Sequence, residues 1–156
     1  MRRVKKICFV ASGGGHLMEI MKLVPAVEGH DLYIVTEKNV ASEGPISKFR
    51  HYYVLQQERR KLNFVFRFFY NFLVSLFYLL KERPDVIVST GAGAAYPTCR
   101  LGKILGIKII FLESFARSKN KSKTGELLYP IADHFLVQWE NMLKFYPKAS
   151  YHGSVY

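Results

Sequence analysis

Three consecutive glycines followed by a histidine are the residues of this chain whose types and spacing best allow chemistry. Residues without a Cβ atom let the backbone approach a ligand closely, and a following helix offers unpaired N–H groups and the positive end of its dipole. The pattern predicts a phosphate site beside an imidazole. A tight turn that only packs a helix on a sheet is the simpler alternative. The predicted site comprises Ser12, Gly13, Gly14, Gly15 and His16.

Two nucleotide-binding motifs fit this loop poorly. It lacks the Lys followed by Ser or Thr that a P-loop requires, so the nucleoside-triphosphatase interpretation fails. Gly13 and Gly15 match the first two glycines of a dinucleotide fingerprint, but Met18 stands where the third belongs. Glu37 ends the next strand-like run at a suitable distance to bind a ribose. A stand-alone dinucleotide-binding α/β enzyme therefore stays as the alternative function.

Length, charge and cysteine content narrow the class of protein. With 156 residues and 49% hydrophobic content, we expect one domain over residues 1–156. The net charge of +11 indicates an anionic partner, namely nucleic acid, an acidic membrane surface or a phosphorylated substrate. Cys8 and Cys99 lack metal-ligand spacing, so we expect core residues of a cytosolic protein, with no metal and no cofactor. The apolar run after the basic start is too short for a signal peptide.

The elements that must position these residues follow from alternating apolar and helical segments. Continuous apolar runs between helices predict an α/β, Rossmann-like fold, a parallel sheet with helices on both faces. Gly44 and Pro45 mark the connection between the second and third strands. Predicted strands cover residues 7–10, 31–36, 51–55, 85–89, 108–112 and 133–138; predicted helices cover 17–27, 61–83 and 96–105, with a short one ending at Phe145.

Two further loops are expected beside the glycine loop, because ligands of such sheets gather at the carboxyl ends of the strands. Gly91 and Gly93 follow the fourth strand and allow close backbone approach. Glu113, after the fifth strand, is a candidate proton shuttle; a carboxylate at a helix N-terminus is its structural alternative. Arg117 is a candidate phosphate ligand, or part of a solvated basic loop.

The predicted helix over residues 61–83 is unusually aromatic. Its polar residues recur every four positions, at Asn63, Arg67, Asn71 and Ser75, so the polar stripe drifts by only about 40° per step. The segment is long enough to span a bilayer, which takes about 20 apolar residues. Arg67 and two asparagines, and its place between two core strands, favour a helix that packs one flank on the sheet.

We therefore expect the other flank to face lipid or a partner. Basic residues at both ends attract anionic headgroups by about 1 kcal/mol each, which predicts peripheral attachment to an anionic membrane surface. An aromatic helix of the protein core is the alternative. The residues assigned to the membrane are Arg60, Lys61, Phe64, Arg67, Phe68 and Phe72.

The order of these motifs resembles one family. The strand into residues 12–16, the loop 89–93 followed by Pro97, the stretch 111–117 (Phe-Leu-Glu-Ser-Phe-Ala-Arg) and the segment 129–133 (Tyr-Pro-Ile-Ala-Asp) carry the likeness, which covers nearly the whole chain. The chain resembles the acceptor-side subunit of the two-component N-acetylglucosaminyltransferase of dolichol-linked glycan assembly, and its bacterial capsule and exopolysaccharide homologues.

The resemblance implies the N-terminal half of a GT-B glycosyltransferase. That half would dock on the cytoplasmic face of the cell membrane and receive a polyprenyl-diphosphate-linked saccharide, while a separate chain binds the nucleotide sugar. The chain ends at Tyr156, where an interdomain connection would begin. The eukaryotic relatives carry an N-terminal spanning helix, whereas the first strand here is expected to start by about Lys5.

The expected reaction is an inverting glycosyl transfer in the cleft between two subunits. Gly13 to Gly15 would hold the acceptor diphosphate, and a neutral His16 would accept the proton of the attacking hydroxyl, because the helix dipole disfavours its imidazolium. Glu113 is the competing base. A nucleic-acid-binding module needs aromatics interleaved with exposed Lys and Arg, but most aromatics here crowd one helix, so we expect no nucleic acid.

Overall fold

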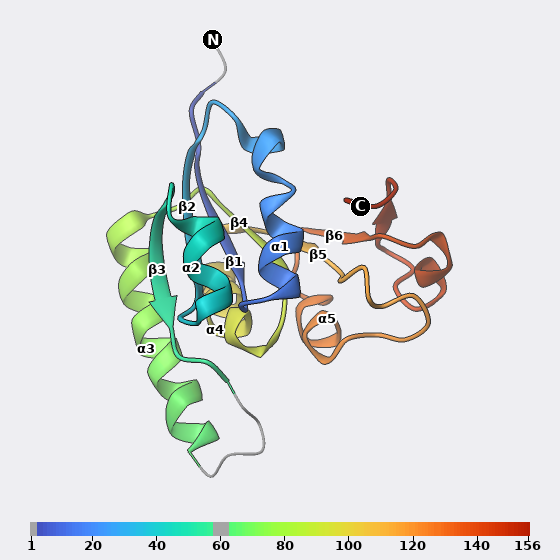
Figure 1. The fold of residues 1–156 in the computed structure, drawn as a ribbon. Helices are drawn as coiled ribbons and strands as arrows, with labels where there is room; N and C mark the ends of the chain where they lie inside the picture. Colours follow the sequence, from blue (N-terminus) through green and yellow to red (C-terminus); the bar gives the residue numbers. More distant parts are fainter. Residues whose placement is uncertain (1–2, 58–62) are drawn as a thin grey trace.

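The protein is built around a seven-stranded parallel sheet (Figure 1). The computed structural model describes residues 3–57 and 63–156. The spatial order of the strands is β3-β2-β1-β4-β5-β6-β7, a Rossmann-like arrangement that confirms the predicted fold class. The strands are β1 (Lys6–Ala11), β2 (Asp31–Glu37), β3 (Arg50–Val54), β4 (Val86–Gly91), β5 (Lys108–Leu112), β6 (His134–Val137) and β7 (Ser150–Tyr151).

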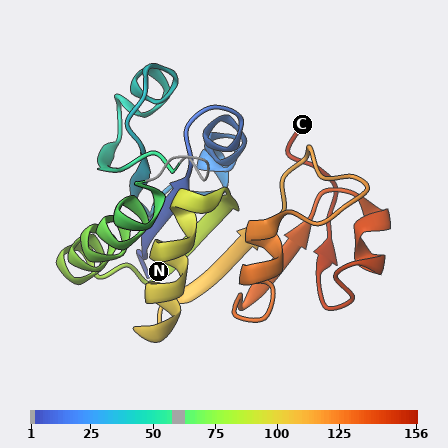
Figure 2. The same ribbon diagram turned by 90° about the horizontal axis from the view of Figure 1, so that it is seen from below.

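Helices cover both faces of this sheet (Figure 2). Leu17 and Ile46, from α1 and α2, pack in the core on one face, and Leu79, Cys99 and Leu128, from α3, α4 and α5, pack on the other. The helices are α1 (Gly15–Met21), α2 (Val40–Ile46), α3 (Phe64–Glu82), α4 (Tyr96–Ile104) and α5 (Lys123–Leu128), with 3₁₀ turns at Val24–Val27, Gly93–Ala95 and Glu140–Lys144.

The predicted strands are confirmed because their apolar runs are buried on both faces. Cys8 to Ala11 of β1 and Tyr33 to Val35 of β2 are almost inaccessible to solvent, as continuous hydrophobic strands of a parallel sheet must be. Both cysteines are free and buried, which confirms their expected place in the core. Burial raises the pKa of Cys99 to about 12, so its thiol is uncharged at neutral pH.

Four elements differ from the expectation. Gly44 and Pro45 lie inside α2, which begins at a capping box formed by Asn39 and Ser42, so this segment is a helix and not only a connection. The basic loop is followed by α5, capped by the Ser122 hydroxyl. The predicted helix 17–27 divides into α1 and a 3₁₀ turn, and β7 extends the sheet by one strand.

The strand order reverses direction between β1 and β4, and this point defines the crevice at the carboxyl edge of the sheet. The pairing of these strands skips Thr90, because Val10 pairs with Ser89 but Ala11 pairs with Gly91. A bulge of this kind locally bends a strand and redirects its side chains and backbone groups. The extra residue lies where the glycine loop after β1 meets the loop after β4.

Candidate functional site

The three glycines of residues 13–15 have different reasons to lack a side chain. A Cβ on Gly13 would lie 2.0 Å from Asn39 Nδ2, and the Gly13 N–H donates to Glu37 Oε2 at 3.3 Å, so this glycine serves packing. Gly14 has φ +77°, a conformation that favours glycine. Gly15 has neither a crowding neighbour nor a positive φ, and a Cβ there would contact nothing within 4 Å. The open space at Gly15 is therefore available to a ligand.

His16 is held by two hydrogen bonds to the bulged residue of β4. Its Nδ1 lies 2.9 Å from the carbonyl oxygen of Thr90, and the Thr90 hydroxyl donates to the His16 carbonyl at 2.7 Å. A carbonyl oxygen can only accept, so Nδ1 carries the proton and Nε2 of the neutral ring is left as an acceptor. The ring is 32% exposed. The geometry fits a group that accepts a proton from a ligand.

The loop after β4 approaches His16 with strained backbone. Gly91 has φ +107°, and a Cβ there would lie 3.7 Å from His16 Cε1. Ala92 has φ 68° and ψ 161°, a region occupied almost only by glycine. Strain of this kind clusters at ligand sites, where the surrounding structure holds it in place. A Cβ on Gly93 would contact Gln57 Oε1 at 3.0 Å.

Glu113 is buried, with 1% of its surface exposed, and its carboxylate is fully used inside the protein. Oε1 accepts the N–H of Ser114 at 3.0 Å. Oε2 accepts the N–H and hydroxyl of Ser122 at 3.2 and 3.1 Å, and the hydroxyl of Tyr146 at 2.8 Å. Burial and this hydrogen bond to Glu113 raise the pKa of Tyr146. The arrangement fixes the start of α5 and leaves little of the carboxylate for a substrate.

The loops enclose a cavity of about 520 Å³, here called the cationic cavity. Its basic residues besides His16 are Arg117, Lys121 and Lys123. Arg117 donates to the side chain of Asn120 at 3.1 Å, and Lys121 lies 3.5 Å from Glu126. The predicted phosphate ligands Gly93 and Arg117 are thus brought together with His16, and the remaining lining residues are Ala92, Ser114, Ala116, Ser122 and Thr124. Across the described ranges, no three His, Cys, Asp or Glu side chains are placed to share a metal.

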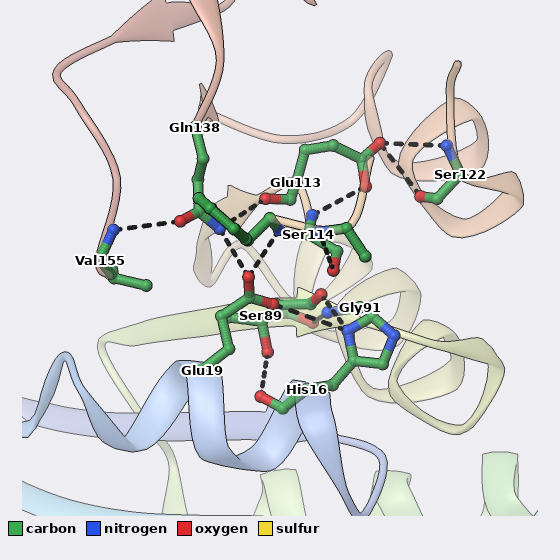
Figure 3. Close-up of polar contacts among 12 residues, drawn as sticks. His16, Glu19, Ser89, Gly91, Glu113, Ser114, Ser122, Gln138 and Val155 are labelled. Carbon is green, nitrogen blue, oxygen red and sulfur yellow. Dashed lines mark hydrogen bonds and ion pairs between the residues drawn. The ribbon is translucent and has the colours of Figure 1, made fainter. Parts of the chain in front are cut away.

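A buried carboxylate that the motifs did not single out, that of Glu19, lies close to His16 (Figure 3). Glu19 Oε1 accepts the N–H of Phe115 at 2.6 Å and the amide of Gln138 at 2.7 Å. Its Oε2 lies 3.8 Å from His16 Nδ1 and has no hydrogen-bond partner in the described part of the chain. Glu19 thus ties the loop after β5 to the helix that carries His16. Its position three residues after His16 was the available signal.

The dinucleotide alternative depended on Glu37 binding a ribose. This carboxylate is buried and accepts the N–H groups of Gly13 and Gln57, the latter at 3.0 Å. It therefore ties the glycine loop to the chain after β3. A ribose at this position would have to displace both hydrogen bonds.

Helix α3 turns its polar residues inward. The Asn71 amide donates to the carbonyl of Leu55 and its oxygen accepts the Leu55 N–H, both at 2.8 Å. Ser75 hydrogen-bonds Thr98 at 2.9 Å, and Arg67 donates to the carbonyl of Gln56 at 3.0 Å. Only 17% of the most apolar 18-residue window is buried. The helix is long and apolar enough to cross a membrane, but it packs on the sheet by its polar stripe.

The side chains that α3 exposes differ from those predicted to face a membrane. Phe64, Phe68 and Phe72 are half-buried, and Phe68 and Phe72 lie against Tyr96 with ring centroids 6.3 and 6.5 Å apart. Since each residue turns the helix by about 100°, Phe68 and Phe72 lie on a flank and not opposite Asn71. Arg60 and Lys61 lie outside the described residues. The exposed apolar residues, here called the outward face, are Val65, Phe66, Phe69, Tyr70, Leu73, Phe77 and Leu80.

Comparison with known proteins decides the family. The model of the family described as "Oligosaccharide biosynthesis protein Alg14 like" matches residues 7–155. The chain belongs to this family. UDP-N-acetylglucosamine transferase subunit ALG14 of the rat is 28% identical over 177 residues, covering 96% of this chain and 82% of the relative. The human subunit of the same name is 27% identical, with 99% and 84% covered. The resemblance drawn from the motifs is thereby confirmed.

The fold of this Alg14-like chain matches about half of several larger proteins of known structure. MurG of Acinetobacter baumannii superposes with a TM-score of 0.76 and 18% identity, over 88% of this chain and 42% of that one. The structure titled "S. aureus MnaA-UDP co-structure" superposes with a TM-score of 0.76 and 13% identity, over 97% and 46%. The chain spans less than half the length of these structures. The predicted equivalence to half of a GT-B glycosyltransferase fold, as in MurG, is confirmed.

Proposed function

We propose that this Alg14-like chain is the acceptor-binding subunit of a two-chain glycosyltransferase. It receives a polyprenyl-diphosphate-linked saccharide, and a separate subunit supplies the UDP-sugar and completes the cleft. We place the reaction in polysaccharide biosynthesis, of capsule or exopolysaccharide type, at the cytoplasmic face of the cell membrane. One observation carries the proposal: in a chain of this family, a cavity with three cationic side chains and His16 lies at the β1–β4 switch point.

The cationic cavity fits a diphosphate by charge and by access. Arg117, Lys121 and Lys123 supply positive charge, and Gly15 supplies room for close approach. Within residues 3–57 and 63–156, Lys123 has no ion-pair partner, so its charge is available to a ligand. In this assignment Ser12, Gly13, Gly14 and Gly91 shape the loops around the anion, since Gly13 already donates to Glu37.

His16 is our candidate for the catalytic base. The acceptor hydroxyl oxygen forms a bond to the anomeric carbon of the sugar as the bond from that carbon to UDP breaks. The hydroxyl proton passes to His16 Nε2, and UDP leaves from the partner subunit. Glu113, buried behind four hydrogen bonds, is assigned a positioning role for the loop before α5 in place of the catalytic role first considered.

The outward face of α3 supports docking on an anionic membrane. Phe66 is 79% exposed and Phe69 is 64% exposed, a degree of apolar exposure that marks interaction surfaces. Lys81 and Arg83 lie at the C-terminal end of the helix, where they would meet lipid headgroups. The chain would therefore lie on the membrane surface, with its cationic cavity beside the lipid-linked acceptor.

Reconstitution tests this function. The chain is combined with a donor-binding subunit from the same organism, a labelled UDP-sugar and membranes containing the lipid acceptor. Transfer is expected from the pair and from neither chain alone. In the pair, His16→Ala should lower kcat by about 100-fold or more, the size of a lost general base. His134→Ala, an exposed histidine at the start of β6, should leave transfer unchanged. Full activity of His16→Ala would reject the assigned base.

A further inference from the structure

A second cavity adjoins the cationic one. It has a volume of about 610 Å³, within the range of small-molecule sites, and is called here the apolar cavity. Phe64, Phe68, Tyr96 and Leu127 supply its apolar lining. Gly93, Lys123 and Thr124 line both cavities, so the two adjoin along a shared wall.

We propose that the apolar cavity binds the isoprene units nearest the diphosphate of the acceptor. This inference rests on the proposed function and adds a substrate determinant to it: the chain recognises the lipid as well as the diphosphate. A fitting ligand has an anionic end with a branched hydrocarbon directly attached. The anionic end would lie in the cationic cavity and the hydrocarbon in the adjoining apolar cavity. A free phosphate or a nucleotide offers only the first of these.

The walls of the apolar cavity are preformed for hydrocarbon. Phe64 stacks on Phe68 with centroids 5.8 Å apart, and Phe68 stacks on Tyr96 at 6.3 Å, so an aromatic wall runs from α3 to the start of α4. Glu126 also lines the cavity, but its carboxylate lies 3.5 Å from Lys121. The anionic group is thus already paired with a cation.

Polar groups gather where the two cavities join. Lys123 is exposed there, and the Nε2 of Gln57 is buried without an acceptor among the residues described. An unsatisfied buried donor is costly unless a ligand or water supplies an acceptor. A diphosphate oxygen at the junction would satisfy Gln57 and neutralise Lys123, which places the first isoprene against Phe68 and Leu127.

The position of α3 explains where the rest of the lipid goes. The helix runs opposite to the strands, so its N-terminal end reaches the carboxyl edge of the sheet (Figure 1). The flank with Phe64 and Phe68 lines the apolar cavity, and the outward face begins one residue away at Val65 and Phe66. A polyprenyl chain leaving the cavity therefore meets the surface that we assign to the membrane.

Calorimetry on the full chain tests the inference with two soluble probes, inorganic diphosphate and a prenyl diphosphate with three isoprene units, kept below its critical micelle concentration. The prenyl diphosphate should bind at least about tenfold more tightly, because burial of a single five-carbon unit suffices for such a gain. Phe68→Ser and Leu127→Ser should each lose most of that preference and keep the affinity for inorganic diphosphate, which also shows that the variants are folded.

Ile104→Ser, an exposed apolar residue at the end of α4 outside this cavity, is the matched control and should keep the full preference. Equal affinity of the unmodified chain for the two probes would overturn the apolar cavity as an isoprene site and leave the diphosphate site standing. Retention of the preference in both cavity variants would overturn it as well. Binding of neither probe would instead reject the proposed function itself.

Discussion

Gly15 is a glycine that the fold does not require, so its replacement can test ligand binding separately from folding. It begins α1, needs no positive φ, and has no neighbour that a Cβ would meet. Gly44 of α2 also has no positive φ and no neighbour outside the adjacent chain that a Cβ would meet, and it lies away from the cationic cavity. The two glycines therefore form a matched pair, one beside the predicted anion and one remote from it.

We predict opposite consequences of Gly15→Ala for stability and activity. Alanine in a helix should raise the free energy of unfolding by about 0.5–1 kcal/mol, because it reduces the freedom of the unfolded chain. The added methyl group should also keep the acceptor diphosphate from approaching, so sugar transfer by the pair of subunits should fall at least tenfold. Urea unfolding and the transfer assay measure the two effects. Gly44→Ala should keep activity but gain no stability, because a Cβ before Pro45 crowds the proline ring; equal activity of both variants would argue against anion binding at the glycine loop.

Asp133 makes a prediction for acid stability at the residue scale. Hydrogen bonds from Lys103 Nζ at 2.7 Å and from the Ile109 N–H at 2.8 Å lower the pKa of its carboxyl, against a smaller opposing effect of burial. A carboxyl whose pKa is lowered by folding stabilises the protein above its unfolded pKa, and this contribution is lost as the pH falls through the folded pKa.

Asp133→Asn should therefore cost at most about 1 kcal/mol at pH 7, because solvent screens this exposed carboxylate, and progressively less as the pH falls below about 4. Urea unfolding at several pH values gives the difference. Glu28→Gln, an exposed carboxylate without a partner in the described residues, serves as control and should change little at any pH. A cost for Asp133→Asn that stays constant down to pH 2 would contradict this role for the charge.

At the scale of elements, α3 is the helix that carries the proposed membrane surface. Its polar stripe is satisfied by the sheet side: Asn71 pairs with the backbone after β3, and Glu82 accepts from Tyr52 and from Lys6 at 3.2 Å. Burial acts to raise the pKa of Glu82, but these hydrogen bonds and the nearby Arg50 outweigh it and lower the pKa. The inward polar contacts leave apolar side chains to solvent, which is the reverse of an ordinary surface helix.

The double variant Phe66→Ser/Phe69→Ser should release the chain from anionic vesicles. Both rings are exposed, so their removal should lower membrane affinity at least tenfold with little effect on the unfolding free energy. Vesicle flotation at low salt measures the bound fraction. Val40→Ser, which removes an apolar side chain that is 92% exposed on α2, should float like the unmodified chain. Failure of the unmodified chain to float would exclude this docking surface.

Sequence patterns predicted the sheet well because burial leaves a direct signature. Continuous apolar runs indicated six of the seven strands, and the rule for carboxyl ends placed Gly93 and Arg117 around one crevice with His16. Helix α2 was missed because Gly44 and Pro45 read as a turn, although Asn39 and Ser42 formed a capping box. The two-residue strand β7 is too short to leave a pattern.

The site was less predictable where a residue type fits two environments. Glu113 has the chemistry of a base, but only the fold shows that Ser122 and Tyr146 use its carboxylate. The spacing of Asn71 and Ser75 predicted a polar stripe on α3 but not which way it faces. A polar stripe can face solvent, or it can face a sheet whose backbone groups need hydrogen-bond partners. Direction depends on tertiary contacts that periodicity does not contain.

At the scale of the whole molecule, the charge of +11 and the likeness to half of a GT-B fold both agree with the proposed acceptor-binding role. In the proposed function the positive charge attracts an anionic acceptor in an anionic membrane, and this chain provides the acceptor side of the cleft. Attraction of this kind is screened by salt, so the association with vesicles should weaken as ionic strength rises. In the proposed complex this chain binds the acceptor and the partner binds the donor.

Equilibrium binding to the isolated full chain tests that division most directly. A short-chain polyprenyl-diphosphate saccharide, UDP-N-acetylglucosamine and NAD are titrated separately into the chain under identical conditions. The account predicts saturable binding of the lipid-linked saccharide, weakened by replacing Arg117 and Lys123 with alanine, and no saturable binding of the two nucleotides. Saturable binding of UDP-N-acetylglucosamine or NAD without binding of the lipid-linked saccharide would contradict it.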